Sequence, residues 1–306
     1  MGKGIRVLLW ALAIVLAFVA GVGIWFWQRP VSFFNAHLYL QMWLGGARSH
    51  YVVAGGHRLH YYEEGEGNGP VVVLVHGLGG RSEDWRNLSV YLKNAGYHIY
   101  LPDLPGYGQS EKPANFSYSV PDEADAVVAF LDAVGLKQID LGGISMGGGI
   151  VQFVAIRHPE RIRKLMLFDA VGIDELPTWD VRLFTPGTPH ELDELEALLM
   201  PNPPQVPPFI ARDVIRISAE NGWVIQRAMA TMITRKDATE KYLPDLKLPT
   251  LVVWGDQDRV FPISQGQKMH QLIPDSHFQV AAGCGHLAPI QCADQIAPGV
   301  IAFLKQ

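Results

Sequence analysis

Residues 7–27 form one apolar run, VLLWALAIVLAFVAGVGIWFW, in which no side chain is charged. As an α-helix with a rise of about 1.5 Å per residue, this run extends for about 31 Å, which matches a bilayer hydrocarbon core of about 30 Å. Lys3 and Arg6 precede the run, and Trp25 and Trp27 lie at its far end, where aromatic rings favour a membrane interface. We therefore expect a single-pass anchor that binds the lipid bilayer through residues 7–27.

A cleaved signal peptide is the competing interpretation of the run. Signal peptides carry about 7–15 apolar residues followed by small side chains at a cleavage site, whereas this run is longer and ends in Ile-Trp-Phe-Trp. A retained anchor is the favoured interpretation. Lys3 and Arg6 favour a cytoplasmic N-terminus and an extracytoplasmic (periplasmic) position for the rest of the chain, a bias that Arg29 and Arg48 weaken.

The segment after the run, residues 31–47, is uncharged and rich in aromatic and aliphatic side chains. It is too short and too polar to cross a bilayer. It can form an interfacial helix that lies on the membrane, or a helix packed beneath the main domain. The adjoining anchor favours the interfacial helix.

The charge balance argues against nucleic acid as a partner. The chain of 306 residues has a net charge of -5, and residues 1–30 contain three basic side chains and no acidic one. The remainder therefore has 22 basic against 30 acidic side chains, a net charge of -8. Such a body should have no general attraction for nucleic acid or for anionic lipid.

Strands and helices alternate from residue 51 onward. A hairpin is predicted over 51–53 and 58–63 with Gly55-Gly56 in its turn, and the run VVVLV at 71–75 has the pattern of a strand buried on both faces. Further strands are predicted at 97–101, 138–142, 164–169, 250–254 and 278–282, with helices at 82–95, 121–134 and 146–157 and a last helix that ends near Leu304. This order predicts an α/β fold with a mostly parallel sheet and helices on both faces.

Residues 171–245 interrupt the alternation. Prolines cluster at positions 201–208, and the recognisable elements are helical, at 191–200, 210–220 and 224–234. We interpret this stretch as an inserted helical cap. The sequence thus divides into an anchor (1–30), a juxtamembrane segment (31–50), a first core part (51–170), the cap (171–245) and a second core part (246–306).

The pattern Gly143-Ile144-Ser145-Met146-Gly147 lies where a predicted strand meets a predicted helix. A sharp turn at this position presents the serine hydroxyl, and small residues permit the turn. A packing turn without chemistry is the alternative, but glycines at a helix start cost up to about 1 kcal/mol each relative to alanine and need a reason. We expect Ser145 to be a nucleophile, with Gly143 and Gly147 as the glycines of its elbow.

A glycine-rich loop, His76-Gly77-Leu78-Gly79-Gly80, follows the strand at 71–75. Such a loop can aim a backbone N–H at the oxyanion that forms when a serine attacks a carbonyl group. We expect Leu78 and Met146 to supply the two oxyanion donors. His76 is expected to be structural.

A serine nucleophile needs a base, and His286 lies in a loop directly after a late predicted strand. In one known chain order the acid of a triad falls between the serine and the histidine. Asp258 is the favoured acid over Asp256, and Asp169 is a third choice. A carboxylate in this position holds the imidazole tautomer and stabilises the imidazolium.

These segments together resemble the α/β-hydrolase superfamily over residues 70–306. The matching stretches are VVVLVHGLGG, LPDLPGYGQSEKP, GGISMGGG, LPTLVVWGDQDRVFP and AAGCGHLAP, in family order and spacing. With its anchor and cap, the chain is similar to membrane-anchored monoacylglycerol lipases and related bacterial esterases. The resemblance implies a Ser145–Asp258–His286 triad, oxyanion donors at Leu78 and Met146, and hydrolysis through an acyl-enzyme without a cofactor.

Three further expectations accompany the resemblance. Asp103 matches a family motif and is expected to have a structural role. Pro298-Gly299 departs from the family pattern and predicts a break or kink in the last helix. Cys284 and Cys292 are expected to be two free, partly buried thiols rather than a bridge. The sequence has no motif for a metal site or for phosphate transfer.

The leading functional hypothesis is a serine carboxylesterase or lipase that hydrolyses lipidic esters such as a monoacylglycerol. A C–C bond hydrolase of ring-fission products is the first alternative, since such enzymes also use a Ser-Met-Gly-Gly elbow. A non-catalytic binding protein that has kept the fold is the second. The serine at the elbow argues against dehalogenases and epoxide hydrolases of this fold, which have an aspartate there.

Overall fold

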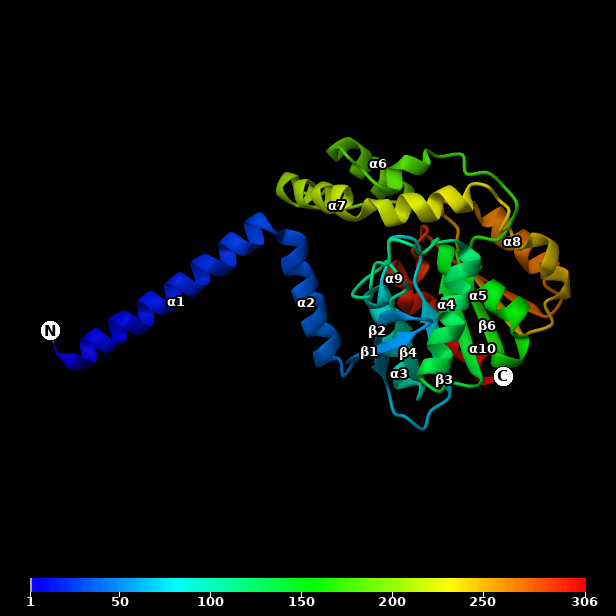
Figure 1. Ribbon diagram of the computed structural model, residues 1–306, viewed down its shortest axis with the longest axis horizontal. Coiled ribbons are helices and arrows are strands. Elements are labelled where there is room, and N and C mark those ends of the chain that lie inside the picture. Colours follow the sequence, from blue (N-terminus) through cyan, green and yellow to red (C-terminus); the bar gives the residue numbers. More distant parts are fainter. Residues whose placement is uncertain (1) are drawn as a thin grey trace.

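The computed structural model describes residues 2–306, and a single mixed sheet forms its centre (Figure 1). The strands lie in the order β1-β2-β4-β3-β5-β6-β7-β8. The strands, in chain order, are β1 (Arg48–Ala54), β2 (His57–Glu64), β3 (Val71–Val75), β4 (His98–Pro102), β5 (Ile139–Ile144), β6 (Ile162–Phe168), β7 (Thr250–Gly255) and β8 (Ser276–Ala281). The strands from β3 to β8 pair in parallel, and β2 is antiparallel to both β1 and β4.

The predicted first hairpin is confirmed. Ala54 of β1 pairs with His57 of β2 across Gly55 and Gly56. Both glycines have positive φ angles, 58° and 84°. A two-residue hairpin turn of this hand needs positive φ at both positions, which glycine adopts without a steric penalty.

Helices cover both faces of the sheet, as the sequence predicts. In β3, Val73 and Val75 belong to one buried cluster and Val72 and Leu74 to the other, because successive side chains of a strand point to opposite faces. The helices α4 (Val120–Ala133), α5 (Met146–Arg157) and α8 (Ile263–Leu272) pack on the first face. The helices α3 (Arg86–Asn94), α9 (Ala288–Gln291) and α10 (Ala293–Lys305) pack on the second.

The cap lies over the end of the sheet at which the parallel strands terminate (Figure 1). It contains α6 (Pro189–Leu199), α7 (Pro208–Met232) and the short 3-10 helices η3 (Val181–Phe184) and η4 (Glu240–Asp245). The prediction of two helices at 210–220 and 224–234 was wrong, because α7 is continuous over 25 residues. Gly222 does not end the helix: it lies in the helix interior, where a Cβ would come within 3.0 Å of the Thr185 side chain.

Two other helix predictions need correction. The helix expected at 82–95 begins with a separate 3-10 turn, η1 (Ser82–Trp85), before α3. The last helix, α10, contains Pro298 and is not broken there. Proline removes one helical hydrogen bond, and the burial of Ile296, Val300 and Phe303 against the sheet offsets this loss. Another short 3-10 helix, η2 (Pro159–Arg161), precedes β6.

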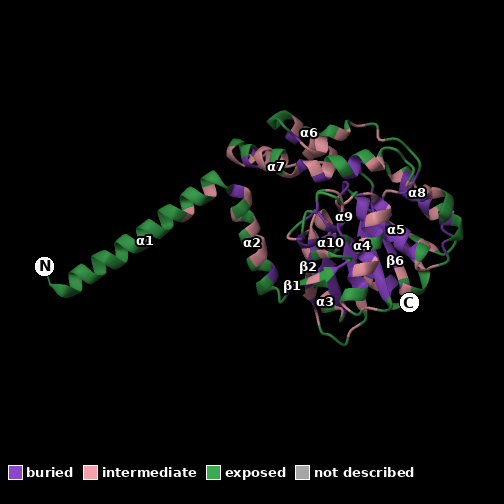
Figure 2. Cartoon of the chain, viewed as in Figure 1, coloured by how far each residue is buried: buried purple, intermediate pink, exposed green. Residues whose placement is uncertain are grey.

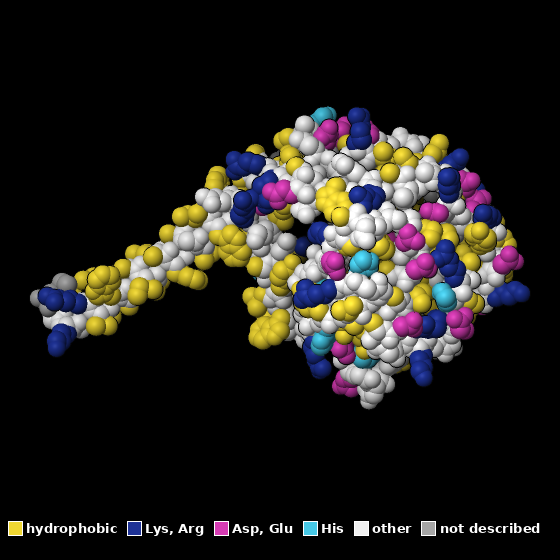
Figure 3. Space-filling model, in the orientation of Figure 1, with side chains coloured by type: hydrophobic (Ala, Val, Ile, Leu, Met, Phe, Trp, Pro, Cys, Tyr) yellow, Lys and Arg dark blue, Asp and Glu magenta, His cyan; other side chains and the backbone are white. Residues whose placement is uncertain are grey.

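The N-terminal helices differ from the rest of the molecule in their exposure. No residue of α1 (Lys3–Gln28) is buried, and the helix projects from the body (Figures 1 and 2). An 18-residue stretch within it has a mean hydropathy of 2.7, and the helix is long and apolar enough for a membrane span. The chain then turns into α2 (Pro30–Leu44), of which Pro30 and Met42 are buried. Figure 3 shows hydrophobic side chains along α1, whereas acidic and basic side chains are interspersed over the body.

Candidate active site

Ser145 occupies a strained turn between β5 and α5. Its φ of 54° and ψ of -121° are rare for a residue with a side chain, and such strain persists only where surrounding contacts enforce it. The Ser145 N–H donates to the Phe168 carbonyl oxygen at 3.0 Å, and the Ser145 carbonyl oxygen accepts from the Val171 N–H at 3.1 Å. These bonds to the end of β6 and the residues after it fix the turn that presents the hydroxyl.

The two glycines of the predicted elbow lie where no side chain fits. A Cβ on Gly143 would be 2.3 Å from the carbonyl oxygen of Gly147. A Cβ on Gly147 would be 2.3 Å from the carbonyl oxygen of His76 and 2.4 Å from that of Val75. Because these neighbours are backbone atoms of packed strands and turns, neither site can relax cheaply around a larger residue.

The structure brings Ser145, His286 and Asp258 together. His286 Nε2 lies 2.8 Å from Ser145 Oγ, and His286 Nδ1 lies 2.9 Å from Asp258 Oδ2. The other carboxylate oxygen, Asp258 Oδ1, accepts from the backbone N–H groups of Val260 and Phe261 at 2.8 and 2.9 Å. A serine, a histidine and an acid in this order can carry out nucleophilic attack with proton transfer to the imidazole.

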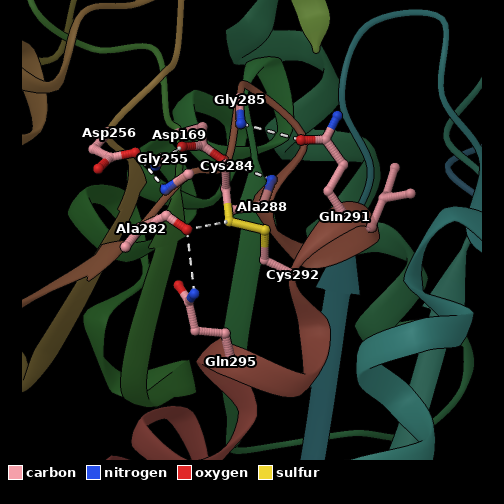
Figure 4. Close-up of a disulfide and its surroundings, with 12 residues drawn as sticks. Asp169, Gly255, Asp256, Ala282, Cys284, Gly285, Ala288, Gln291, Cys292 and Gln295 are labelled. Carbon is pink, nitrogen blue, oxygen red and sulfur yellow. Dashed lines mark hydrogen bonds between the residues drawn. A yellow bond between two sulfur atoms is a disulfide. The ribbon is translucent and has the colours of Figure 1, made fainter. Parts of the chain in front are cut away.

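The two other acids considered from the sequence have different contacts. Asp256 Oδ1 accepts from the Gly283 N–H at 2.7 Å, on the loop that precedes the histidine. Asp169 is buried and has a positive φ of 45°. Its Oδ1 accepts from the Gly255 N–H at 2.8 Å and its Oδ2 from the Ala288 N–H at 3.2 Å (Figure 4). Burial, and then the charge of Asp258, raise the pKa of Asp169 well above its usual range. Asp169 thus connects the loops of the acid and the histidine to β6.

Leu78 and Met146, the two expected oxyanion donors, are both neighbours of Ser145 in the structure. Leu78 and Ser145 line the same cavities, and Met146 follows the serine as the first residue of α5. Within residues 2–306, neither amide donates a hydrogen bond to another group of the protein. Both N–H groups are therefore free to bind an oxyanion.

His76 supports the glycine-rich loop, as expected of a structural residue. Its Nδ1 lies 2.8 Å from the Gly77 carbonyl oxygen, and its Nε2 accepts from the Leu104 N–H at 3.1 Å. Complete burial lowers the pKa of His76, which favours the neutral ring that these two bonds need.

Asp103 also has the expected structural role. Its carboxylate accepts from the N–H groups of Ser82 and Gln109 at 2.7 and 2.9 Å, and lies 2.7 Å from His60 Nδ1. Burial opposes the charge of Asp103, but the hydrogen bonds with His60 and with the Gln109 and Ser82 backbone N–H groups hold its pKa below the usual range. The carboxylate thereby ties the segment after the glycine-rich loop to β2.

The prediction of two free thiols was wrong, because Cys284 and Cys292 form a disulfide (Figure 4). The turn of α9 reverses the chain and brings the two Cα atoms to 6.4 Å, within the range that a disulfide spans. The Gly285 N–H donates to Gln291 Oε1 at 3.1 Å inside the same loop. The disulfide therefore closes a short loop that contains His286.

Two cavities meet at Ser145. The smaller has a volume of about 90 Å³ and is bordered mostly by apolar side chains, among them Trp179, Phe184 and Phe261. The larger, of about 620 Å³, also contains His286 and extends between α7 and α2. Its lining by Val31 and Asn35 of α2 was not anticipated from the sequence, whose only signal was the uncharged character of residues 31–47. Within residues 2–306, no group of three or more His, Cys, Asp or Glu side chains is placed to hold a metal ion.

A sequence profile of the α/β hydrolase fold matches residues 70–229 and 216–291. The chain belongs to the α/β hydrolase fold family. This result confirms the fold expected from the sequence, and the protein is a hydrolase. The matched residues include the serine elbow, the acid and the histidine.

Relatives of the chain include lipases and C–C bond hydrolases. The chain is 27% identical to Lipase 1 of Psychrobacter immobilis, over 82% of each protein. It is 29% identical to 2-hydroxymuconate semialdehyde hydrolase of Pseudomonas putida, over 83% of this chain and 93% of that one. A crystal structure of a membrane phospholipase A aligns with a TM-score of 0.82 and 28% identity, and covers 98% of both chains. Lipases and C–C bond hydrolases are thus about equally similar in sequence.

Proposed function

We propose that this α/β hydrolase is a membrane-anchored serine carboxylesterase or lipase that acts on lipidic esters of the monoacylglycerol kind. The observation that carries the proposal is the continuity of α1, α2 and the large cavity at Ser145. An apolar helix long enough to span a bilayer leads directly into a helix that lines the cavity. An ester dissolved in the membrane has a high local concentration next to such a cavity and can enter it from the bilayer.

The coverage of the structural relatives supports the same choice. The membrane phospholipase A matches 98% of this chain, a span that includes the N-terminal helices. The A129V mutant of a meta-cleavage product hydrolase (CumD) matches 84% of it, with a TM-score of 0.76 and 25% identity. The additional matched length favours an enzyme that acts at a membrane.

The reaction uses the three side chains in turn. Ser145 Oγ forms a bond to the ester carbonyl carbon while His286 Nε2 takes the hydroxyl proton, and the Leu78 and Met146 amides bind the oxyanion. Collapse of this intermediate breaks the ester C–O bond, and His286 returns the proton to the departing alcohol. Water then attacks the acyl-enzyme, again losing a proton to His286, and the acid leaves as Ser145 is restored. Asp258 stabilises the imidazolium in both steps.

The test compares wild type with S145A on p-nitrophenyl butanoate and on a monoacylglycerol. We expect S145A to lose at least about 10³-fold in kcat and to lose labelling by a fluorophosphonate probe. S117A, which alters an exposed serine, is the matched control. Full activity of a folded S145A would refute the role of the serine. Turnover of a vinylogous diketone with no ester hydrolysis would instead assign the enzyme to the C–C bond hydrolases.

The catalytic domain is proposed to lie on the extracytoplasmic side of the membrane, with α2 at the interface. Disulfides persist in oxidising compartments, and Cys284–Cys292 is one. Large apolar side chains of α2, namely Phe34, Leu40, Trp43 and Leu44, are exposed along the helix next to the anchor. Protease added to spheroplasts of a bacterial host should digest the domain. Protection until the membrane is lysed would place it in the cytoplasm.

A further inference from the structure

The start of α2 is attached to the cap through a buried carboxylate. The backbone N–H of Val31 donates to Asp213 Oδ2 of α7 at 3.1 Å. Asp213 Oδ1 accepts from Arg216 at 2.8 and 2.9 Å and lies 3.9 Å from Arg29 Nη1. The side chain of Asp213 is only 3% exposed. A carboxylate at a helix N-terminus satisfies a free backbone N–H group and complements the helix dipole.

Aromatic contacts hold the end of α1 on the same cap helix. The Trp27 ring stacks on the Phe209 ring, with centroids 4.8 Å apart and planes at 9°. The Phe26 ring meets Phe209 edge-on at 5.4 Å. The junction of α1 and α2 is therefore packed against the first turns of α7.

The middle of α2 contacts the catalytic core instead. Asn35 Oδ1 accepts a hydrogen bond from Arg81 Nη1 at 2.8 Å. Arg81 directly follows the glycine-rich loop that contains Leu78. The helix α2 thus bridges the cap and the loop that carries a proposed oxyanion donor.

The same helix borders the space in which a substrate would lie. The cavity of about 620 Å³ that contains Ser145 and His286 is also lined by Val31 and Asn35 of α2, and by Val214 and Ile217 of α7. The cavity thus extends from Ser145 to the space between α2 and α7, which is open to the longer chain of a lipidic substrate.

We propose that α2 is a substrate-binding wall of the active site and that Asp213 and Asn35 position it. The part of a lipidic substrate that is remote from the ester bond lies against this wall. The proposal rests on the ester hydrolysis proposed above and adds a specificity role to a segment that would otherwise serve only as a link to the membrane. In this proposal Asp213 is a positioning residue, and Asn35 both positions the wall and lines it.

The test uses the full chain in detergent micelles and two p-nitrophenyl esters, the butanoate and the dodecanoate. For each variant, D213N and N35A, the measured quantity is kcat/KM for the dodecanoate divided by kcat/KM for the butanoate. We expect each variant to lower this ratio about tenfold, mainly through a higher KM for the dodecanoate. The reason is that each variant loses a hydrogen bond that holds the wall. E220Q is the control for D213N, since Glu220 also pairs with Arg216 and its carboxylate does not bond to α2. Q41A is the control for N35A, because Gln41 is an exposed amide on the same helix.

The outcomes separate this proposal from that of ester hydrolysis. An unchanged ratio in both variants, or equal losses on the two esters, would overturn the proposal that α2 is a substrate-binding wall. N35A and D213N test this proposal independently, so poor folding of one variant leaves the other as a test. If wild type hydrolyses neither ester, the proposed reaction fails. Binding of dansyl-undecanoic acid to S145A then decides: a Kd raised about tenfold by N35A, and not by Q41A, supports the wall, and an equal Kd refutes it.

Discussion

The backbone N–H of His286 donates a hydrogen bond to the carbonyl oxygen of Leu199, across 3.0 Å. Leu199 is the last residue of α6, so the end of this cap helix directly contacts the loop of the proposed base. Gly285, the preceding residue, lies against the same carbonyl group, where a Cβ would be 2.5 Å from the oxygen. The cap and the histidine are therefore packed as one unit.

G285A should lower kcat/KM for p-nitrophenyl butanoate by about 10- to 100-fold. The added methyl group must displace either Leu199 or the histidine loop, and small errors in the position of a catalytic group are costly. Steady-state kinetics measure the effect. G187A is the control in the cap, because its Cβ would have no neighbour closer than 3.5 Å. Equal kinetics of the two variants would show that the contact does not position His286.

Replacing the disulfide in C284S/C292S should lower the free energy of unfolding by about 2.5 kcal/mol, the chain-entropy value for so short a loop. The melting temperature should fall by about 5–10 °C for a domain of this size. Calorimetry with and without dithiothreitol measures both. The reductant should lower the melting temperature of wild type but not that of the double variant. Two titratable thiols in native, unreduced protein would contradict the pairing.

D169N should lower the free energy of unfolding by about 1–3 kcal/mol and also lower kcat. The side-chain amide of this variant has one carbonyl oxygen, which can accept from only one of the two backbone N–H groups that Asp169 binds. Its NH₂ group then faces the second N–H group, and two donors repel each other. Urea denaturation and ester kinetics provide the two measurements. D256N removes an acceptor from an exposed contact of the same loop and should have a smaller effect. Equal effects of D169N and D256N would argue against a connecting role for Asp169.

E123Q should stabilise the protein at pH 8 but not at pH 4. Glu123 of α4 is buried, and neither of its carboxylate oxygens has a hydrogen-bond partner within residues 2–306. Burial, and then the charge of Asp122, raise its pKa well above the usual 4.5. The folded state therefore holds this proton more tightly than the unfolded chain does.

This difference fixes the sign of the pH effect. Below pH 4.5 Glu123 is protonated in both states, and its penalty is absent. As the pH rises toward the raised pKa, the unfolded chain binds fewer protons than the fold, and stability falls by about 1.4 kcal/mol per pH unit. Melting curves of E123Q and wild type should diverge over this range. E66Q, at an exposed position, should follow wild type throughout. Parallel curves for E123Q would show that Glu123 is not desolvated.

Short-range patterns in the sequence predicted the elements that carry the site. The apolar run at 71–75, the Gly55-Gly56 turn and the serine at a strand-to-helix boundary depend on backbone geometry and on side-chain periods within a few residues. The same patterns failed between residues 220 and 224, where Gly222 lies, and the break that Pro298 allows does not occur. In the fold, burial of neighbouring side chains offsets the local cost, and both helices continue.

The sequence by itself determined the apolar N-terminal run and the alternating α/β order, and it indicated the candidate serine and histidine at strand ends, because each is encoded by neighbouring residues. It left three candidate acids, of which the structure places Asp258 2.9 Å from His286. Only the tertiary structure decided that Cys284 bonds to Cys292, that Asp169 bridges two loops, and that Asp213 of the cap binds the start of α2. Val31 and Asp213 are 182 positions apart. No local propensity specifies such a contact, since it arises from how completed helices and loops pack. That packing makes the helix after the apolar run part of the cavity that contains Ser145.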